Sequence, residues 1–312
     1  MTEHETAAAR SRGNLLTLEA GEYRAEISTL GATVESLTVG GRDLLVRNPE
    51  TGPMLFYRGA VIAPWPNRIG DGRYTWDGQE LQTPITEVER GNALHGLISF
   101  QPFAPVTLAE DEVVLRSELY PTTGYPFHLL LTVHHALDPE AGLTTSVTAR
   151  NIGAADAPFG TCPHPYLVAG PEALDTWTLQ VTAGQVLEVT ADRLLPTGTA
   201  DVTPGSEFDF SAGRVIGAQE IDHAFTGLAR DAQGLWRVTV TAPGGTGVEL
   251  TAGEECPWLQ LHTADRPEPE HHRLGLAVEP MTCPPDAFRS GIDVVRLAPG
   301  GEHEASWSIR GW

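Results

Sequence analysis

The sequence predicts an all-β protein, a large antiparallel sandwich or barrel with few short helices. Three observations support this prediction. Stretches in which apolar and polar residues alternate recur along the chain, and this period of two is the pattern of a half-buried strand. Gly and Pro account for 33 and 24 of the 312 residues and are spread along the chain, which favours short elements. Helical periodicity is not sustained over ten residues anywhere. Many short strands between turn formers are typical of sandwiches and barrels.

The clearest strand patterns, in chain order, are 106–119 (VTLAEDEVVLRSEL), 143–150 (LTTSVTAR), 236–242 (WRVTVTA), 248–253 (VELTAG) and 273–279 (RLGLAVE). Each is rich in Val, Thr, Leu or Trp and alternates with period two. The best candidates for short helices are 211–220 and 285–289. We find no fixed-period repeat and no composition break. We therefore expect a disordered leader over residues 1–13 and one domain over 14–312.

The charge balance excludes several classes of chemistry. The chain has 41 acidic residues and 20 basic ones, for a formal net charge of -21, and all 20 basic residues are arginine. Without lysine there is no Schiff-base lysine, no P-loop lysine and no Ser-Lys nucleophile pair. A broadly acidic surface also disfavours nucleic acid, which is bound by basic faces that displace counterions.

Cysteine usage and hydropathy indicate the compartment. Cys162, Cys256 and Cys283 form no C-x-x-C pair, so a reduced, cytoplasmic environment is the better interpretation. The leader has no apolar segment of the signal-peptide kind, and the longest apolar run is too short to span a bilayer. The sequence therefore predicts no membrane partner, and it leaves open a monomer or a homodimer.

Common catalytic and metal motifs are absent from the sequence. It contains no G-x-S-x-G, H-E-x-x-H, P-loop or dinucleotide-binding fingerprint. Histidine pairs occur at 134–135 and 271–272. Adjacent residues on a strand point to opposite faces, so such a pair rarely chelates one ion. We therefore predict no metal site.

Two candidate residues lie in the first third of the chain. Arg68, in PWPNRIGDGRYTWDG, follows two prolines, and its guanidinium fork suits vicinal hydroxyls or a carboxylate. The alternative is an ordinary surface hairpin, which DGRYTWDG also predicts. His95, in GNALHGL, lies between leucines and next to glycine. The alternative for His95 is a core histidine with its hydrogen bonds satisfied.

His164 lies between two prolines in FGTCPHPYL, where the chain neither continues a helix nor pairs normally in a central strand. A rigid, irregular backbone around an imidazole is what a positioned acid or base requires. A purely structural turn is the alternative.

Glu279 ends the run 273–279, on the side where the preceding residues are Ala277 and Gly275. The missing bulk beside this carboxylate leaves room for a small ligand. The alternative is a surface glutamate before a proline. Asp222, in EIDHAF, is a weaker candidate, a carboxylate that enters an apolar patch.

Five segments in this order resemble the aldose 1-epimerases, the mutarotases of the galactose mutarotase type: NRIGDGRY (67–74), NALHG (92–96), HPYL (164–167), IDHAF (221–225) and AVEPMTCPPDAF (277–288). The resemblance extends from about residue 15 to 309. It implies a single-domain β-supersandwich that binds a free aldose, such as glucose or galactose, and interconverts its α and β anomers without a cofactor.

By the same resemblance, the general acid falls on His164 and the general base on Glu279. Arg68, His95 and Asp222 fall on positions that hold the sugar hydroxyls and ring oxygen. Three departures are expected to touch the pocket walls and thus the choice of sugar: Trp65-Pro66 before NRI, Phe100 after the HG motif, and HPYL in place of the commoner HPYF.

Three other functions stay open from the sequence. One is a glucose-6-phosphate 1-epimerase, which needs extra cations for the phosphate. Another is a non-catalytic sugar-binding β-sandwich. The third is a glycoside hydrolase that uses a carboxylate pair such as Glu279 and Asp222.

Overall fold

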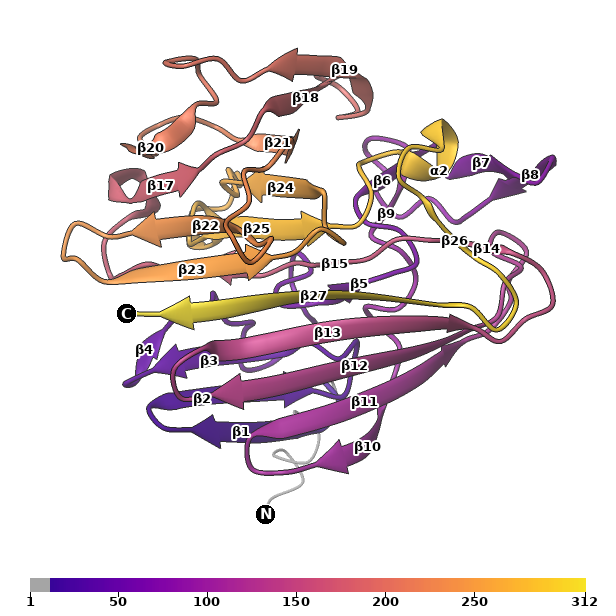
Figure 1. Ribbon diagram of the computed structural model, residues 1–312, viewed down its shortest axis with the longest axis horizontal. Helices are drawn as coiled ribbons and strands as arrows, with labels where there is room; N and C mark the ends of the chain where they lie inside the picture. The colour runs from indigo at the N-terminus through magenta and orange to yellow at the C-terminus, as the bar shows by residue number, and fades with distance from the viewer. Residues whose placement is uncertain (1–11) are drawn as a thin grey trace.

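The computed structural model describes residues 12–312, and its regular elements are almost all antiparallel strands (Figure 1). Two large sheets dominate the molecule, and a four-stranded sheet packs against the larger of them. The predicted all-β fold class is confirmed. The predicted leader lies outside the described residues up to position 11, and its extent stays a prediction, as does the single domain over 14–312.

The largest sheet has nine strands, in spatial order β10 (Ala104–Leu108), β11 (Glu112–Leu119), β12 (Leu129–Asp138), β13 (Gly142–Asn151), β27 (Glu302–Gly311), β23 (Gly247–Ala252), β22 (Trp236–Thr241), β17 (Thr178–Val181) and β20 (Phe210–Val215). The C-terminal strand β27 lies at its centre, between β13 and β23. The two halves of the sheet are therefore joined by the last segment of the chain.

The second sheet has six strands and carries two of the five candidate residues, Asp222 and Glu279. Its order is β16 (Tyr166–Leu167), β25 (Leu276–Met281), β24 (Trp258–His262), β21 (Asp222–Thr226), β18 (Gln185–Val189) and β19 (Pro196–Asp201). The register places Gln260 between Glu279 on one neighbouring strand and Ala224 on the other. Residues on one face of this sheet are thus brought together from distant parts of the sequence.

Smaller sheets and single turns complete the fold. The four-stranded sheet contains β1 (Leu15–Ala20), β2 (Tyr23–Ser28), β3 (Val34–Val39) and β4 (Arg42–Asp43). The two-stranded pairs are β5 (Val61–Ile62) with β15 (Cys162–Pro163), β6 (Arg68–Gly70) with β9 (Asn92–Leu94), β7 (Arg73–Trp76) with β8 (Gln79–Gln82), and β14 (Ala157–Phe159) with β26 (Val295–Leu297). The helical turns are η1 (Leu174–Thr176), η2 (Pro269–His271) and α2 (Ala287–Ser290).

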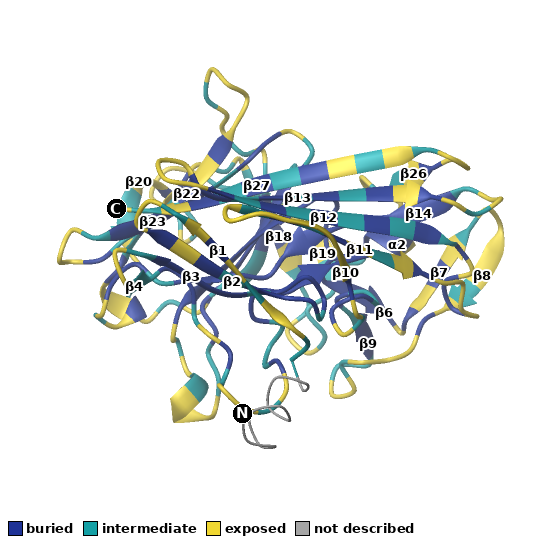
Figure 2. Cartoon of the chain, turned by 90° about the horizontal axis from the view of Figure 1, so that it is seen from below, coloured by how far each residue is buried: buried dark blue, intermediate teal, exposed yellow. Residues whose placement is uncertain are grey.

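Burial alternates along some strands and is continuous along others. Residues of β12 alternate between buried and half-buried positions up to its exposed last residue (Figure 2), whereas all six residues of β25 are buried. Alternation marks a sheet with one face on the core, and continuous burial marks a strand covered on both faces. The adjacent His134 and His135 illustrate the first case. His134 contacts Glu112 at 2.9 Å, while the fully buried His135 contacts Thr145 on the opposite face at 2.9 Å.

The predicted strands at 143–150, 236–242 and 248–253 are confirmed by β13, β22 and β23. The run 106–119 is divided into the hairpin strands β10 and β11. The strand predicted over 273–279 begins only at Leu276. Arg273 has a positive φ of 52° and is held by ion pairs to Asp175 and Asp265, so the chain is not extended there.

One helix prediction is wrong and the other is confirmed in part. Residues 211–220 form most of β20 and a following turn. Gly213 and Gly217 have φ values of 77° and 60°, which a right-handed helix does not contain. The candidate at 285–289 is the single turn α2. It begins after Asp286, which has a φ of 61°.

Candidate active site

A cavity of about 730 Å³ brings together all five residues that the sequence analysis singled out. They come from β6, the end of β9, the link between β15 and β16, β21 and β25, and are Arg68, His95, His164, Asp222 and Glu279. A charged cavity at the meeting point of several elements is the expected location of a ligand site.

Arg68 is held in place by Glu87, a residue that the sequence analysis missed. Its Nε donates to Glu87 Oε2 at 2.9 Å and its Nη2 to Oε1 at 3.0 Å, while Nη1 donates to Asn67 Oδ1 at 3.2 Å. Two parallel charge-assisted hydrogen bonds fix the plane of a guanidinium. The predicted surface hairpin exists as β7–β8. Arg68 lies outside it with a side chain only 10% exposed, which excludes the surface alternative.

His95 follows β9 at a sharp turn of the backbone. Its φ is 57°, and Gly96 after it has a φ of 65°. A Cβ on Gly96 would collide with the carbonyl of Ala63, so glycine is required at this position. The backbone N–H of His95 donates to Asn67 O at 2.9 Å. Within the described chain, its buried Nδ1 has no hydrogen-bond partner, which does not fit a core histidine with satisfied hydrogen bonds.

His164 is fixed at both its backbone groups. Its N–H donates to Ala60 O, and its carbonyl accepts from Gly59 N–H, each at 3.0 Å. The imidazole stacks on Tyr166 with ring centroids 5.1 Å apart, and its side chain is 6% exposed. The rigid, irregular backbone expected between the two prolines is thus present, and it presents a buried ring to the cavity.

The side chain of Glu279 lies next to the imidazole of His164. Its Oε1 is 3.4 Å from His164 Nε2, and its side chain is only 2% exposed. The thiol of Cys162 lies 4.0 Å from Oε2. The alternative of a surface glutamate is therefore excluded. The expected room beside Gly275 is also absent, because a Cβ there would lie 2.6 Å from Val46 Cγ2.

Asp222 and Gln260 lie beside this pair on neighbouring strands. Gln260 Nε2 donates to Asp222 Oδ1 at 2.7 Å, and His262 Nδ1 is 3.8 Å from Asp222 Oδ2. Sequence analysis missed both Gln260 and His262. A signal was present, since WLQLH places the two polar residues two positions apart in an otherwise apolar strand, and such positions share a face.

Burial lowers the pKa values of His164 and His95. Burial lowers the pKa of His164 to about 3, and the charges of His262 and Arg266 add to this effect. Burial also lowers the pKa of His95 well below its usual value, reinforced by His164 and Arg68. Both rings are therefore held neutral in the empty cavity near neutral pH.

The two carboxyl groups are shifted in opposite directions. Burial raises the pKa of Glu279 well above its usual value, the charge of Asp222 raises it further, and Arg68 opposes both. Burial also acts to raise the pKa of Asp222, but His262, Arg68 and other partners outweigh it and lower that pKa. The surroundings thus favour the charged form of Asp222 and the protonated form of Glu279, so the two carboxyl groups are suited to different tasks.

Arg266 is a further cation in the cavity that the sequence analysis did not single out. It lies over the ring of Phe56 at 4.4 Å from the ring centroid, and its Nη2 is 3.4 Å from His262 Nε2. Among the described residues, no carboxylate lies within ion-pair distance of it. Its charge is thus not neutralised by a neighbour, in contrast to that of Arg68.

Three residues at which the sequence departs from the family's usual pattern do not lie in the cavity wall. Trp65 packs on Phe288 in the core, Leu167 is fully buried, and Phe100 is 57% exposed. None of the three lines the cavity. The expectation that these residues touch the pocket walls is therefore wrong.

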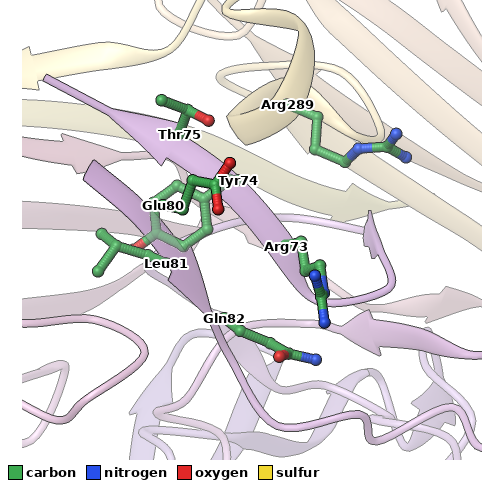
Figure 3. A pocket seen from close by; sticks show the side chains of 7 residues that line it. All are labelled: Arg73, Tyr74, Thr75, Glu80, Leu81, Gln82 and Arg289. Carbon is green, nitrogen blue, oxygen red and sulfur yellow. The ribbon is translucent and has the colours of Figure 1, made fainter. Parts of the chain in front are cut away.

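A second hollow, of about 380 Å³, lies over the β7–β8 hairpin and α2 (Figure 3). Arg73, Glu80 and Arg289 border it. The hydroxyl of Tyr74, another lining residue, donates to Gly124 O at 2.9 Å. This hollow contains none of the five candidate residues and no pair of acid and base.

The aldose 1-epimerase family model matches residues 14–310. The chain belongs to the aldose 1-epimerase family. It is 36% identical over 300 residues to the uncharacterized protein YihR of Escherichia coli K12, covering 96% of this chain and 94% of that protein. It is 26% identical to the galactose mutarotase of Sus scrofa, covering 94% and 92% of the two chains.

This member of the family also shares its fold with solved structures. The crystal structure of the GalM/aldose epimerase homologue from C. elegans has a TM-score of 0.83 at 17% identity and covers 96% of this chain and 98% of that one. At this identity the likeness shows the fold alone. Within residues 12–312 no helix is both long and apolar enough to cross a membrane.

Proposed function

We propose that this chain is an aldose 1-epimerase that interconverts the α and β anomers of a free aldose such as glucose or galactose. The observation that carries the proposal is the pair formed by His164 Nε2 and Glu279 Oε1, 3.4 Å apart in a buried cavity. The hydroxyl and the ring oxygen of a cyclic aldose are both bonded to C1. Groups that serve these two oxygens must therefore lie close together, as this pair does.

Ring opening requires a base at the C1 hydroxyl and an acid at the ring oxygen. Glu279 removes the hydroxyl proton, His164 protonates the ring oxygen, and the C1–O5 bond breaks to give an aldehyde. Rotation about C1–C2 exposes the other face of the carbonyl. The two groups then exchange roles, and ring closure regenerates their starting protonation.

The pKa shifts favour one of the two protonation forms that the Glu279 and His164 pair takes in this cycle. A protonated Glu279 with a neutral His164 contains the same number of protons as a carboxylate with an imidazolium. Burial favours the first form in the empty cavity, and that is also the form that closes the open-chain sugar. The positive charge of Arg68 favours the Glu279 carboxylate. Passage between the two forms moves one proton across the pair.

The remaining candidate residues orient the substrate. Arg68, fixed by Glu87, offers N–H donors, and Asp222 offers a carboxylate acceptor beside Glu279. His95 completes the group with a ring centroid 4.9 Å from that of His164. Groups placed in this way restrict the sugar to poses in which C1 faces the catalytic pair.

The test is polarimetry on freshly dissolved glucose or galactose. His164→Gln and Glu279→Gln are each expected to lower catalysed mutarotation by about 10²–10⁴-fold, since each removes one acid–base group. His134→Gln is the matched control, because His134 is half-exposed and remote from the cavity. Near wild-type activity in either cavity variant would remove that residue from its assigned role.

A sugar that carries an anionic group, such as glucose 6-phosphate, is the second candidate substrate. The observation that favours it is Arg266, which lines the cavity with no carboxylate at ion-pair distance among the described residues. Guanidinium groups bind phosphate strongly. Comparison of the rates on glucose and glucose 6-phosphate, with Arg266→Gln as the variant, decides between the two substrates.

Two further functions are distinguished by what the chain does to a sugar. Sugar binding without faster anomer exchange would indicate a non-catalytic binding protein. Release of reducing sugar from an aryl glycoside would indicate a hydrolase. The cytoplasm is the proposed location, a choice supported by Cys162, Cys256 and Cys283, which are all free thiols.

A further inference from the structure

The catalytic cavity also contains a set of metal-ligand atoms. His95, His164 and Glu279 each offer one such atom, and the three atoms all lie within 4.8 Å of one another. In a tetrahedral zinc site with bonds of about 2.0–2.1 Å, neighbouring ligand atoms are about 3.3–3.5 Å apart. His164 Nε2 and Glu279 Oε1, at 3.4 Å, already have this spacing. The other two pairs need shifts of no more than about 1.5 Å to reach it.

The chemistry of the three donors matches zinc. Two imidazoles and one carboxylate form the ligand set of many catalytic zinc sites, in which the fourth position is left to water. Mg²⁺ prefers carboxylate, carbonyl and water oxygens, so it is a poor competitor for this set. The cavity of about 730 Å³ leaves space for the water ligand.

We propose that Zn²⁺ binds to His95, His164 and Glu279 in the empty cavity and that zinc and sugar exclude each other. This inference rests on the proposed function, because the atoms that hold zinc are those assigned to the sugar C1 hydroxyl and ring oxygen. A bound zinc ion occupies the lone pairs of the acid–base pair. Zinc is therefore a competitive inhibitor of anomer exchange.

The surroundings of His164 indicate that the ion is released readily. In a resident metal site, the second nitrogen of a ligating histidine usually donates to a carboxylate or a carbonyl. With Nε2 facing Glu279, the second nitrogen of His164 is Nδ1, which is buried and has no hydrogen-bond partner among residues 12–312. Loss of such a partner typically weakens metal affinity by about 10–100-fold.

The test combines direct binding with inhibition. The full chain, freed of metal by a chelator, is titrated with Zn²⁺ against a chromophoric zinc indicator, without sugar and then with saturating glucose or galactose. We expect one zinc ion per chain and a weaker apparent affinity when sugar is present. Polarimetry at about ten times the zinc Kd is expected to show an apparent KM raised about tenfold, with kcat unchanged. EDTA should restore activity, and Mg²⁺ should have no effect.

Variants identify the ligands independently of activity. His95→Gln and Glu279→Gln are each expected to weaken zinc binding at least about tenfold, whereas the exposed His134→Gln should leave it unchanged. Circular dichroism tests whether each variant is folded. If His95→Gln does not fold, Glu279→Gln alone tests the ligand assignment.

The proposal is overturned by an absence of zinc binding, by zinc binding that both variants leave intact, or by zinc binding that is lost only in His262→Gln. Zinc binding with no effect of sugar, in a chain that polarimetry shows to be active, also overturns it. A chain inactive on all sugars in the presence of EDTA instead refutes the proposed function.

Discussion

Replacement of Glu87 by glutamine tests whether the orientation of Arg68 depends on one ion pair. Glu87 accepts two hydrogen bonds from Arg68, at 2.9 and 3.0 Å, and a third from Asn92 at 2.8 Å. The side chains of Glu87 and Arg68 are 12% and 10% exposed. A glutamine amide at this position would have one acceptor oxygen and would direct N–H groups at existing donors.

The expected magnitude follows from this burial. Removal of one partner of a buried ion pair costs about 3–5 kcal/mol, and the slight exposure of this pair places it near the lower end. That figure is a loss of folding stability; a misplaced Arg68 guanidinium is separately expected to lower kcat/KM by roughly 10²-fold. Because Arg68 is assigned to orientation, most of the loss should be a rise in KM, accompanied by lower stability.

The assay is mutarotation over a range of sugar concentrations, with urea unfolding measured in parallel. Glu80→Gln is the matched control, since Glu80 is an exposed carboxylate on β8 and does not line the cavity. Wild-type KM, kcat and stability in the Glu87 variant would refute the idea that Glu87 positions Arg68. A fall in kcat alone would place Arg68 in the chemical step instead.

Three further predictions concern stability and pH. His135 is buried and its pKa is lowered to about 4, so between pH 6.5 and 4 the unfolded chain binds a proton that the folded chain does not. Stability therefore decreases as pH falls through this window, by about 2 kcal/mol from His135 between pH 7 and 5. Urea unfolding of wild type and His135→Gln should differ in this slope, and equal slopes would contradict the assignment. Gly96→Ala, with its positive φ and its collision with Ala63, should destabilise the fold by at least about 1–3 kcal/mol in urea unfolding; an unchanged midpoint would contradict the strain. Asp222→Asn removes a charge that raises the pKa of Glu279. It should shift the pH profile of kcat/KM toward lower pH. An unchanged profile would show that the charge of Asp222 does not act on the pKa of Glu279.

Residue patterns along the sequence predicted the fold class and the members of the candidate site. Alternation in β13, β22 and β23 is local and was interpreted correctly. The pattern failed where tertiary contacts override it. The segment from Arg273 to Gly275 alternates like a strand, but two ion pairs hold Arg273 out of an extended conformation. The helix predicted over 211–220 does not form because Gly213 and Gly217 have positive φ values.

The sequence does not predict the roles of Glu87 and Arg266, because both roles depend on how distant segments pack. Glu87 reaches Arg68 only because β6 and β9 pair and the segment between β8 and β9 folds back over them. Arg266 is significant because no carboxylate of the described chain lies within ion-pair distance of it. That property belongs to the assembled cavity.

The sequence by itself determined which residue types were available: arginine as the only strong cation, His164 between two prolines, and Glu279 in an apolar strand. These properties depend on composition and on local restriction of the backbone, and both can be read directly from the order of residues. Only the tertiary structure decided that His164 and Glu279 lie 3.4 Å apart and that burial moves their pKa values in opposite directions. Distance and desolvation arise when segments more than a hundred residues apart pack together, so no local pattern specifies them.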